Sequence, residues 1–380
     1  MIKQRKLDAL TSLRFFAAAM IVIGHTHPLF GSAGIATNFS LAQGVSFFFV
    51  LSGFILKYNY SKLGDWHEIK RFFVARFARI YPSHIAAIAL LFLLTGGLNL
   101  GGLDKLQSVF VGFLNLFLLQ SLVPLKDVFL TYNGVAWSIS TEFWFYLFFP
   151  LLISSFIRGH IYKLVILLSV VISFLCFAVL WQVSADEGST QFSLLGILYV
   201  NPLVRIFEFY IGVLACEVFL KMQLKFEVEK SSQIKFTIIE ICVVVLTISS
   251  LWLTPRLVAY LHIGGELGVI LNYYFTKSGS ALAFALLIVV FASNFGVLSR
   301  FISGKVFILL GEISFALYLV HMSALIFFKS FIVSHPDISI ALQVLLFWSM
   351  SLLLAWALHK VVENPFRKLI LKFYDSRHGR

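Results

Sequence analysis

The chain has 380 residues, of which 59% are hydrophobic and only 13% are charged, and its mean hydropathy is +0.92. This excludes an ordinary soluble domain, which does not need so much apolar surface. The net charge of +12 comes largely from short basic segments beside apolar runs, as in membrane proteins, so we expect no nucleic-acid partner. The three cysteines, Cys176, Cys216 and Cys242, lie in apolar runs and predict neither a disulfide framework nor a metal site.

Ten apolar segments are candidates to cross a hydrocarbon core of about 30 Å. They are residues 12–30, 42–57, 83–99, 138–156, 163–183, 203–219, 236–253, 279–295, 307–328 and 340–360. A membrane-spanning backbone must satisfy its own hydrogen bonds, and the alternation typical of a membrane β-barrel is absent. The chain is therefore predicted to be all-α, a polytopic membrane helix bundle of about ten spans, with residues 1–380 forming a single integral-membrane domain.

A further apolar segment, 106–122, is predicted to be re-entrant. Lys3, Arg5 and Lys6 place the N-terminus in the cytoplasm by the positive-inside rule. A full crossing by 106–122 would put most later basic loops outside, whereas a segment that dips in and returns keeps them and the basic C-terminal tail inside. We therefore expect a multi-pass protein with both termini in the cytoplasm.

The first apolar segment contains two ionisable residues, Arg14 and His25, eleven positions apart. At about 3.6 residues per turn this spacing is close to three full turns, so both side chains point to nearly the same face, roughly 16 Å apart along the axis. Ionisable groups within a lipid-spanning helix are costly and usually mark a site. We expect Arg14 to hold an anionic donor near one surface and His25 to act chemically at greater depth.

Three ionisable groups on different predicted spans, His25, Glu142 and His321, fall in the outer half of the bilayer. A carboxylate beside a histidine orients the ring and raises its basicity, as a general base requires, so Glu142 is the expected partner of His25 and His321 an expected neighbour. His321 could instead serve only as a hydrogen-bonding group between helices. Arg205 and Glu208, at i and i+3, could be a purely structural pair.

A basic loop predicted at 57–82 contains Arg71, Arg76 and Arg79, in RFFVARFARIYPSH. An arginine cluster at the inner surface binds phosphates well. Contact with anionic lipid alone is the other interpretation. Arg14, near the inner end of the first span, could extend this cluster into the membrane.

Small residues in the second span, Gly44, Ser46, Ser52 and Gly53, would let helices approach closely, either for packing or to form a narrow channel. Near the C-terminus, Glu363 and Arg367 flank Pro365 and are expected to form a capping ion pair.

Taken together, the motifs of this chain resemble the acyltransferase-3 family of integral-membrane acyltransferases, which includes O-antigen, exopolysaccharide and Nod-factor O-acetyltransferases. The motifs are Arg14-x10-His25, FFFVLSGFIL, RFFVARFARIYP, WSISTEFWFY, LGEISFALYLVHM and ENPFR, in that order, between residues 10 and 368. The resemblance assigns Arg14 and His25 to the Arg-x10-His pair of the family, and Arg71, Arg76 and Arg79 to its arginine-containing loop. It assigns Trp137, Ser138, Ser140 and Glu142 to the family's WSxSxE segment. Many members also carry an extracytoplasmic hydrolase-like domain, and we expect this chain to work without one fused to it.

The resemblance implies acetyl-CoA, or another acyl-CoA, as a cytosolic co-substrate, with no permanently bound cofactor and no metal, in the inner membrane of a bacterium. The expected acceptor is a hydroxyl of a cell-surface or secreted glycan or of its lipid-linked precursor. The pantetheine arm of CoA, roughly 15–20 Å long, is comparable to the helical rise between Arg14 and His25. The alternatives are a glycan-lipid transporter or flippase, and a non-enzymatic lipid-sensing subunit. Residues on the predicted outer side are candidate sugar contacts by type only: Tyr132, Asn133, Tyr199, Asn201, Asn272, Tyr273 and Tyr274.

Overall fold

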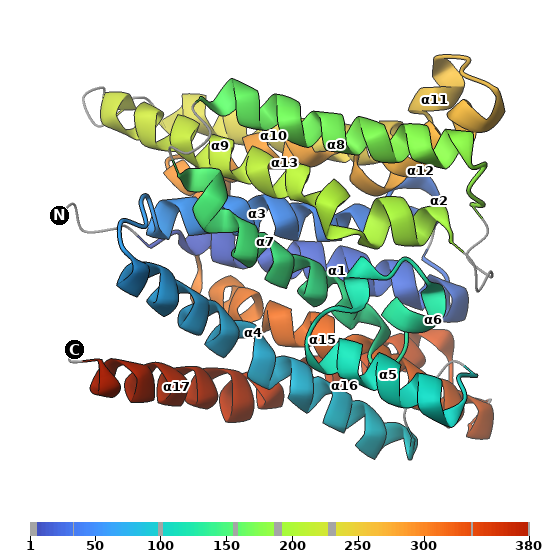
Figure 1. The fold of residues 1–380 in the computed structure, drawn as a ribbon. Helices are drawn as coiled ribbons and strands as arrows, with labels where there is room; N and C mark the ends of the chain where they lie inside the picture. Colours follow the sequence, from blue (N-terminus) through green and yellow to red (C-terminus); the bar gives the residue numbers. More distant parts are fainter. Residues whose placement is uncertain are drawn as a thin grey trace.

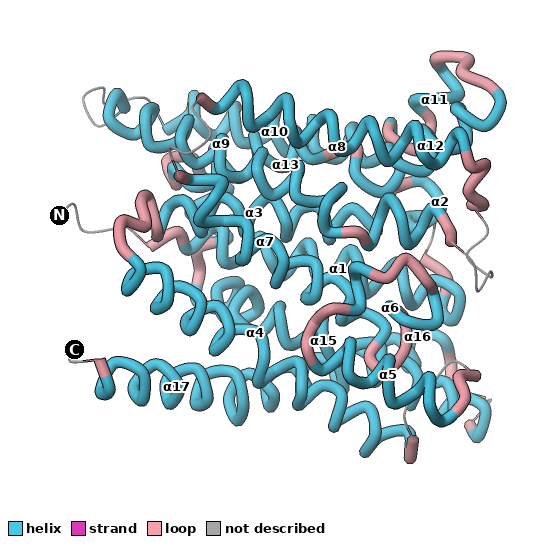
Figure 2. The backbone as a smooth tube through the Cα atoms, viewed as in Figure 1, coloured by secondary structure: helices cyan, strands magenta, loops and turns pink. Residues whose placement is uncertain are grey.

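The computed structural model describes residues 6–32, 34–97, 102–154, 159–185, 192–226, 233–335 and 337–378, and Lys3, Arg5 and parts of several predicted loops lie outside these ranges. The α-helices are α1 (Asp8–Phe30), α2 (Ile35–Asn38), α3 (Gly44–Asn59), α4 (Trp66–Thr95), α5 (Lys105–Leu116), α6 (Lys126–Phe129), α7 (Trp137–Ile153), α8 (His160–Leu180), α9 (Pro202–Phe226), α10 (Gln233–Leu253), α11 (Leu257–Tyr260), α12 (Gly265–Ser278), α13 (Ala281–Ser293), α14 (Val297–Ile302), α15 (Lys305–Ser334), α16 (Ile340–Leu358) and α17 (Asn364–Arg377). Within these ranges there is no β-strand, and Figure 2 shows short loops between long helices. The predicted all-α class is confirmed.

Nine stretches of the described chain are long and apolar enough to cross a membrane. They are Asp8–Phe30, Leu41–Asn59, Trp66–Thr95, Gly134–Ile153, His160–Leu180, Gln233–Leu253, Gly265–Ser293, Lys305–Ser334 and Ile340–Arg377. The remaining predicted span, 203–219, lies within α9, a 25-residue helix that is more polar because it carries Arg205, Glu208 and Glu217. The protein is therefore a multi-pass membrane protein, and the expectation of about ten spans agrees with nine such stretches plus α9.

The segment 106–122 does not cross the bundle. Helix α5 has only 12 residues, about 18 Å at 1.5 Å per residue, which is too short for a core of about 30 Å. A capping box between Asp104 and Gln107 begins it, and Leu118 follows it with a left-handed φ of 57°. Figure 1 shows α5 and α6 together at the end of the bundle opposite the two termini, which agrees with the predicted re-entrant segment.

The predicted basic loop at 57–82 is largely helical. Helix α4 begins at Trp66, because Asp65 is its N-cap and accepts a hydrogen bond from the Glu68 amide at 2.7 Å. Arg71, Arg76 and Arg79 therefore project from a helix, and their spacing rather than loop flexibility decides which of them point into the bundle.

Helices α1 and α15 run parallel in close contact. A Cβ atom built on Gly311 would lie 2.0 Å from the carbonyl oxygen of Thr11, so only a glycine allows this approach. Farther along the same pair, Phe30 packs against Phe328 with ring centroids 6.0 Å apart. Because residue numbers rise together on both helices, α1 and α15 have a fixed parallel register.

Helices α3 and α9 pack through a reciprocal pair of glycines. A Cβ atom on Gly53 would lie 1.9 Å from the Phe209 carbonyl oxygen, and one on Gly212 would lie 1.9 Å from that of Val50. The small residues of the second span thus serve close helix packing at Gly53.

The stretch Gly265–Ser293 is a broken helix, since α12 ends at Ser278 and α13 begins at Ala281. The buried side chain of Gln43 compensates for the interruption. Its amide nitrogen donates to the Phe275 carbonyl at 3.3 Å, and its amide oxygen accepts from the Ser280 amide at 2.7 Å. Backbone groups freed by a break within a membrane protein need such internal partners.

We predict that Gly53→Ala destabilises the protein by about 1–3 kcal/mol, since the added methyl group forces α3 away from α9. Thermal unfolding of the purified protein in detergent, followed by tryptophan fluorescence, measures the effect. The control is Gly97→Ala, because a Cβ atom there meets nothing within 4 Å. Equal melting temperatures for the two variants would contradict the packing argument.

Candidate active site

A pair of hydrogen-bonded histidines joins α1 to α15. His25 Nδ1 lies 2.8 Å from His321 Nε2, and the two rings are nearly parallel, with centroids 5.2 Å apart. The parallel register of α1 and α15 brings them together although they are 296 positions apart in the chain. The expected proximity of His25 and His321 is thus present as a direct contact.

The second nitrogen of His321 determines the direction of this hydrogen bond. His321 Nδ1 lies 2.7 Å from the backbone carbonyl oxygen of Tyr318. A carbonyl oxygen can only accept, so His321 Nδ1 carries the hydrogen and the Nε2 of the neutral ring is an acceptor. His25 Nδ1 then donates to it, and the Nε2 of His25 is left with its lone pair, as a general base requires.

The two histidines differ in exposure. The side chain of His321 is completely buried, whereas His25 is exposed. An incoming molecule can therefore reach the ring of His25, whereas the buried His321 is its hydrogen-bond partner.

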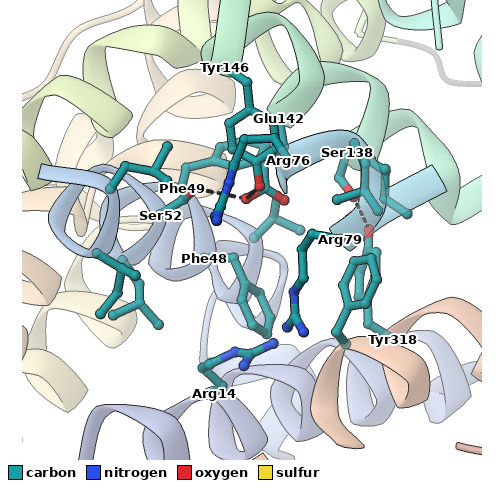
Figure 3. A pocket seen from close by; sticks show the side chains of 17 residues that line it. Arg14, Phe48, Phe49, Ser52, Arg76, Arg79, Ser138, Glu142, Tyr146 and Tyr318 are labelled. Atoms are coloured by element: carbon teal, nitrogen blue, oxygen red, sulfur yellow. Dashed lines mark hydrogen bonds between the residues drawn. The ribbon is translucent and has the colours of Figure 1, made fainter. Parts of the chain in front are cut away.

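A cavity adjoins the histidine pair where α1, α3, α4, α7 and α15 meet, and it encloses about 880 Å³ of space outside the protein atoms, including its mouth (Figure 3). Tyr318 is one of its lining residues, and the Tyr318 ring centroid lies 5.8 Å from that of His321. The Tyr318 hydroxyl donates to the Val135 carbonyl at 3.0 Å and accepts from Ser138 at 2.7 Å. Tyr318 thus lines the cavity and lies next to His321.

Three arginines, Arg14, Arg76 and Arg79, extend into the same cavity, as Figure 3 shows. Arg79 is held by an ion pair with the fully buried Glu363. The Arg76 guanidinium lies 5.6 Å from the ring centroid of Tyr60, in a cation–π contact. The cavity therefore combines positive charge with apolar walls.

Glu142 also lines the cavity, but it is not the partner of the histidines. Its carboxylate accepts hydrogen bonds from Ser52 at 2.7 Å and from Tyr146 at 2.6 Å. The structure describes Glu142, His25 and His321, and no hydrogen bond joins Glu142 to either histidine. The predicted pairing of Glu142 with His25 is therefore wrong. Depth alone suggested that pairing, and depth does not tell which way a helix is rotated. Ser52, expected to serve either close packing or a narrow channel, hydrogen-bonds to this carboxylate.

Arg71, predicted with the other arginines, does not line this cavity. Its guanidinium forms a two-point ion pair with Asp375 on α17, with nitrogen–oxygen distances of 3.0 and 3.2 Å. On α4, Arg71 lies eight positions before Arg79 and therefore more than two turns away. Sequence proximity to Arg76 and Arg79 is thus a poor guide to its position.

Arg205 and Glu208 form the structural pair considered from their spacing. Their side chains are 3.1 Å apart and both are buried. Arg205 also donates to Ser46 at 3.0 Å, which ties α9 to α3. This ion pair lies outside the cavity lining and supports the bundle.

Several site residues were not recognised from the sequence. Glu363 was expected to pair with Arg367, but it forms an ion pair with Arg79 and accepts a hydrogen bond from His359 Nδ1 at 3.0 Å. Lys277 lies near the middle of the broken span Gly265–Ser293. The signal that could have revealed it is a charged residue within an otherwise apolar stretch.

Comparison with known proteins extends over nearly the whole chain. The family described as "Acyltransferase domain" matches residues 7–360. Acyltransferase MdmB of Streptomyces mycarofaciens is 34% identical over 158 residues, which cover 38% of this chain and 39% of that protein. Nodulation protein 10 of Rhizobium leguminosarum bv. viciae is 32% identical over 165 residues, covering 37% of this chain and 42% of that protein.

O-acetyltransferase OatA of Staphylococcus aureus is 23% identical over 393 aligned positions, covering 97% of this chain but 58% of that protein. The alignments thus span less than two thirds of each of these relatives. No solved structure matches the chain. The family match is continuous across the helices that carry the histidine pair and the arginine cavity, and the chain belongs to the acyltransferase-3 family of acyltransferases.

Proposed function

We propose that this protein transfers an acetyl group from cytosolic acetyl-CoA to a hydroxyl of a cell-surface or secreted glycan, or of its lipid-linked precursor. The observation that carries the proposal is the hydrogen bond between His25 and His321 next to Tyr318, which lines a cavity that also holds three arginines. The names of the relatives, among them an O-acetyltransferase, support the reaction class.

The arginines suit the phosphates of CoA. Arg14, Arg76 and Arg79 present guanidinium groups to one space, and guanidinium binds phosphate through charge-assisted hydrogen bonds. Along α1, the rise from Arg14 to His25 is roughly 16 Å, comparable to an extended pantetheine arm. CoA phosphates at the arginines would therefore place the thioester near the histidines.

His25 has the hydrogen-bonding state of a general base. In the proposed reaction its Nε2 takes the proton of the acceptor hydroxyl while the hydroxyl oxygen attacks the thioester carbonyl carbon. The carbonyl electron pair moves onto oxygen and returns as the carbon–sulfur bond breaks. The departing CoA thiolate takes the proton from His25, so the products are the acetyl ester and free CoA, and His25 is regenerated.

His321 is proposed as the positioning residue. As acceptor of the His25 Nδ1 hydrogen bond it fixes the ring and its tautomer, the part that the sequence suggested for Glu142. Glu142 is instead proposed to act within the cavity, where its negative charge offsets part of the arginine charge and orients Ser52 and Tyr146.

The distribution of basic side chains supports one orientation of the bundle in the membrane. Figure 1 shows both chain termini at one end of the bundle. We propose that this end faces the cytosol of a bacterial inner membrane, since basic side chains such as Lys57 and Arg71 belong on the cytosolic side by the positive-inside rule. The re-entrant α5 then lies on the outer side, where a glycan would approach.

We predict that His25→Ala lowers glycan acetylation by about 10²- to 10⁴-fold, the usual contribution of a general base. Mass spectrometry of the surface polysaccharide, from cells with the gene, without it or with a variant, measures the acetyl content. His27→Ala is the matched control, because His27 lies on the same helix but pairs with Ser32 at 2.9 Å. Normal acetylation in cells carrying His25→Ala, with the protein inserted in the membrane, would refute the proposed base.

A second prediction concerns donor binding. Arg14→Ala and Arg79→Ala should each raise the KM for acetyl-CoA by about 10- to 100-fold, since each removes one charged hydrogen-bond donor. Arg71→Ala should change it little, because Arg71 pairs with Asp375 and does not line the cavity. Acetyl-CoA titrations of membranes that contain each variant provide the KM. A larger rise for Arg71→Ala than for Arg79→Ala would show that the donor binds elsewhere.

A further inference from the structure

The cavity has two chemically different ends, and helix α7 extends from one to the other. At the first, the Arg76 guanidinium lies 5.9 Å from the ring centroid of Tyr146, a lining residue. At the second, the lining residue Ser138 donates a hydrogen bond to the Tyr318 hydroxyl at 2.7 Å. Ser138 and Tyr146 are eight positions apart on α7, which is a rise of about 12 Å. The cavity is therefore elongated, with an arginine end and a tyrosine end.

The tyrosine end is the one nearer to the histidine pair. Tyr318 is three positions before His321 on α15, and the two ring centroids are 5.8 Å apart. Phe315 lines the cavity about one turn farther from His321, and its ring centroid lies 5.4 Å from the Arg79 guanidinium. The order along α15 thus leads from the arginines past Phe315 and Tyr318 to the histidine.

Helix α3 gives the same order. Its first residue, Gly44, is so close to α1 that an added Cβ atom would lie 2.8 Å from Cγ1 of Ile21. Ile21 is four positions before His25 and therefore lies about one turn away on the same face of α1. Val45, which follows Gly44, is buried and lines the cavity. The start of α3 is thus at the histidine side of the cavity.

Phe48 narrows the cavity on this side. It is about one turn beyond Val45 on α3, and Figure 3 shows its side chain extending into the cavity. Its ring centroid lies 6.3 Å from that of Tyr318. Phe47 packs against Phe48 in a T-shaped contact at 6.1 Å, and the Tyr318 hydroxyl is held by Ser138 and the Val135 carbonyl. Moving either ring aside would therefore break other contacts.

The acyl group of the donor would lie beside these two rings. With the CoA phosphates at the arginine end, the extended pantetheine arm carries the thioester toward the tyrosine end. An acetyl group adds only a methyl group beyond the carbonyl carbon, whereas a longer chain needs space that close-packed side chains do not leave. One methylene too many in an apolar pocket commonly lowers kcat/KM by about 10- to 200-fold.

We propose that Phe48 restricts the transferred group to acetyl, because its ring occupies the space that a longer acyl chain would need. Phe48 is then a specificity-determining residue. This inference rests on the proposed acyl transfer. The competing explanation is that Phe48 only lines the path of the pantetheine arm. All acyl-CoA donors share that arm, so removal of the ring would then affect every donor alike.

The test is a competition between two donors in membranes that contain the full-length protein. Equal concentrations of acetyl-CoA and butyryl-CoA are supplied together, and mass spectrometry of the glycan counts the acetyl and butyryl groups. The product ratio gives the ratio of the two kcat/KM values. We expect the wild-type protein to favour acetyl by at least about 100-fold. Phe48→Ala should lower this preference by about 10- to 100-fold, since the removed ring leaves space for the additional methylenes.

Phe315→Ala is the matched control, because it removes the same ring from the arginine end of the same cavity. Its product ratio should stay within about twofold of the wild-type ratio, whatever its effect on total transfer. Thermal unfolding shows which variants are folded. If Phe48→Ala is not, Phe48→Leu replaces it, and propionyl-CoA replaces butyryl-CoA because leucine frees less space.

A wild-type product ratio in the folded Phe48 variant would overturn the proposal, as would an equal shift for Phe315→Ala. Wild-type protein that transfers acetyl and butyryl equally well would also overturn it. The proposed function fails separately, if the wild-type protein transfers neither group. If the wild-type protein transfers acetyl and the Phe48 variant keeps the same preference, only the role of Phe48 fails.

Discussion

The close contact of α1 with α15 is the constraint on which the candidate site depends. At Gly311 the backbone of α1 occupies the space that a side chain would need, which brings the two helices together in a fixed parallel register. In that register His25 faces His321, and the Tyr318 carbonyl determines which nitrogen of each ring carries hydrogen. A glycine near one end of the helix pair thus helps to bring His25 and His321 together farther along it.

Buried charges are tolerated here because almost every one described has a specific partner. Glu363 holds Arg79, Glu208 holds Arg205, and aromatic rings cover Arg76 and Lys277. In an apolar interior an uncompensated charge would be expensive, whereas an ion pair or a ring face lowers that cost while keeping the group in place. Ser46 and Arg205 link α3, α9 and the end of α12 in one buried polar network.

The broken span Gly265–Ser293 illustrates how this network serves two purposes. Its interruption leaves backbone groups that need partners, which Gln43, Ser46 and Arg205 supply. The same interruption places Lys277 beside the rings of Tyr199 and Tyr273. In an uninterrupted helix these backbone groups would form hydrogen bonds within the helix. They would then not need Gln43, Ser46 and Arg205 as partners.

The sequence by itself determined the all-α class, nearly all the membrane spans and the short segment that does not cross the bundle. These follow from local periodicity, apolar length and loop charge, which are properties of neighbouring residues. Only the tertiary structure decided that His321, and not Glu142, contacts His25, and that Arg71 pairs with Asp375 and does not line the cavity. Such choices depend on helix rotation and on contacts between residues hundreds of positions apart, and periodicity within one helix carries no information about either.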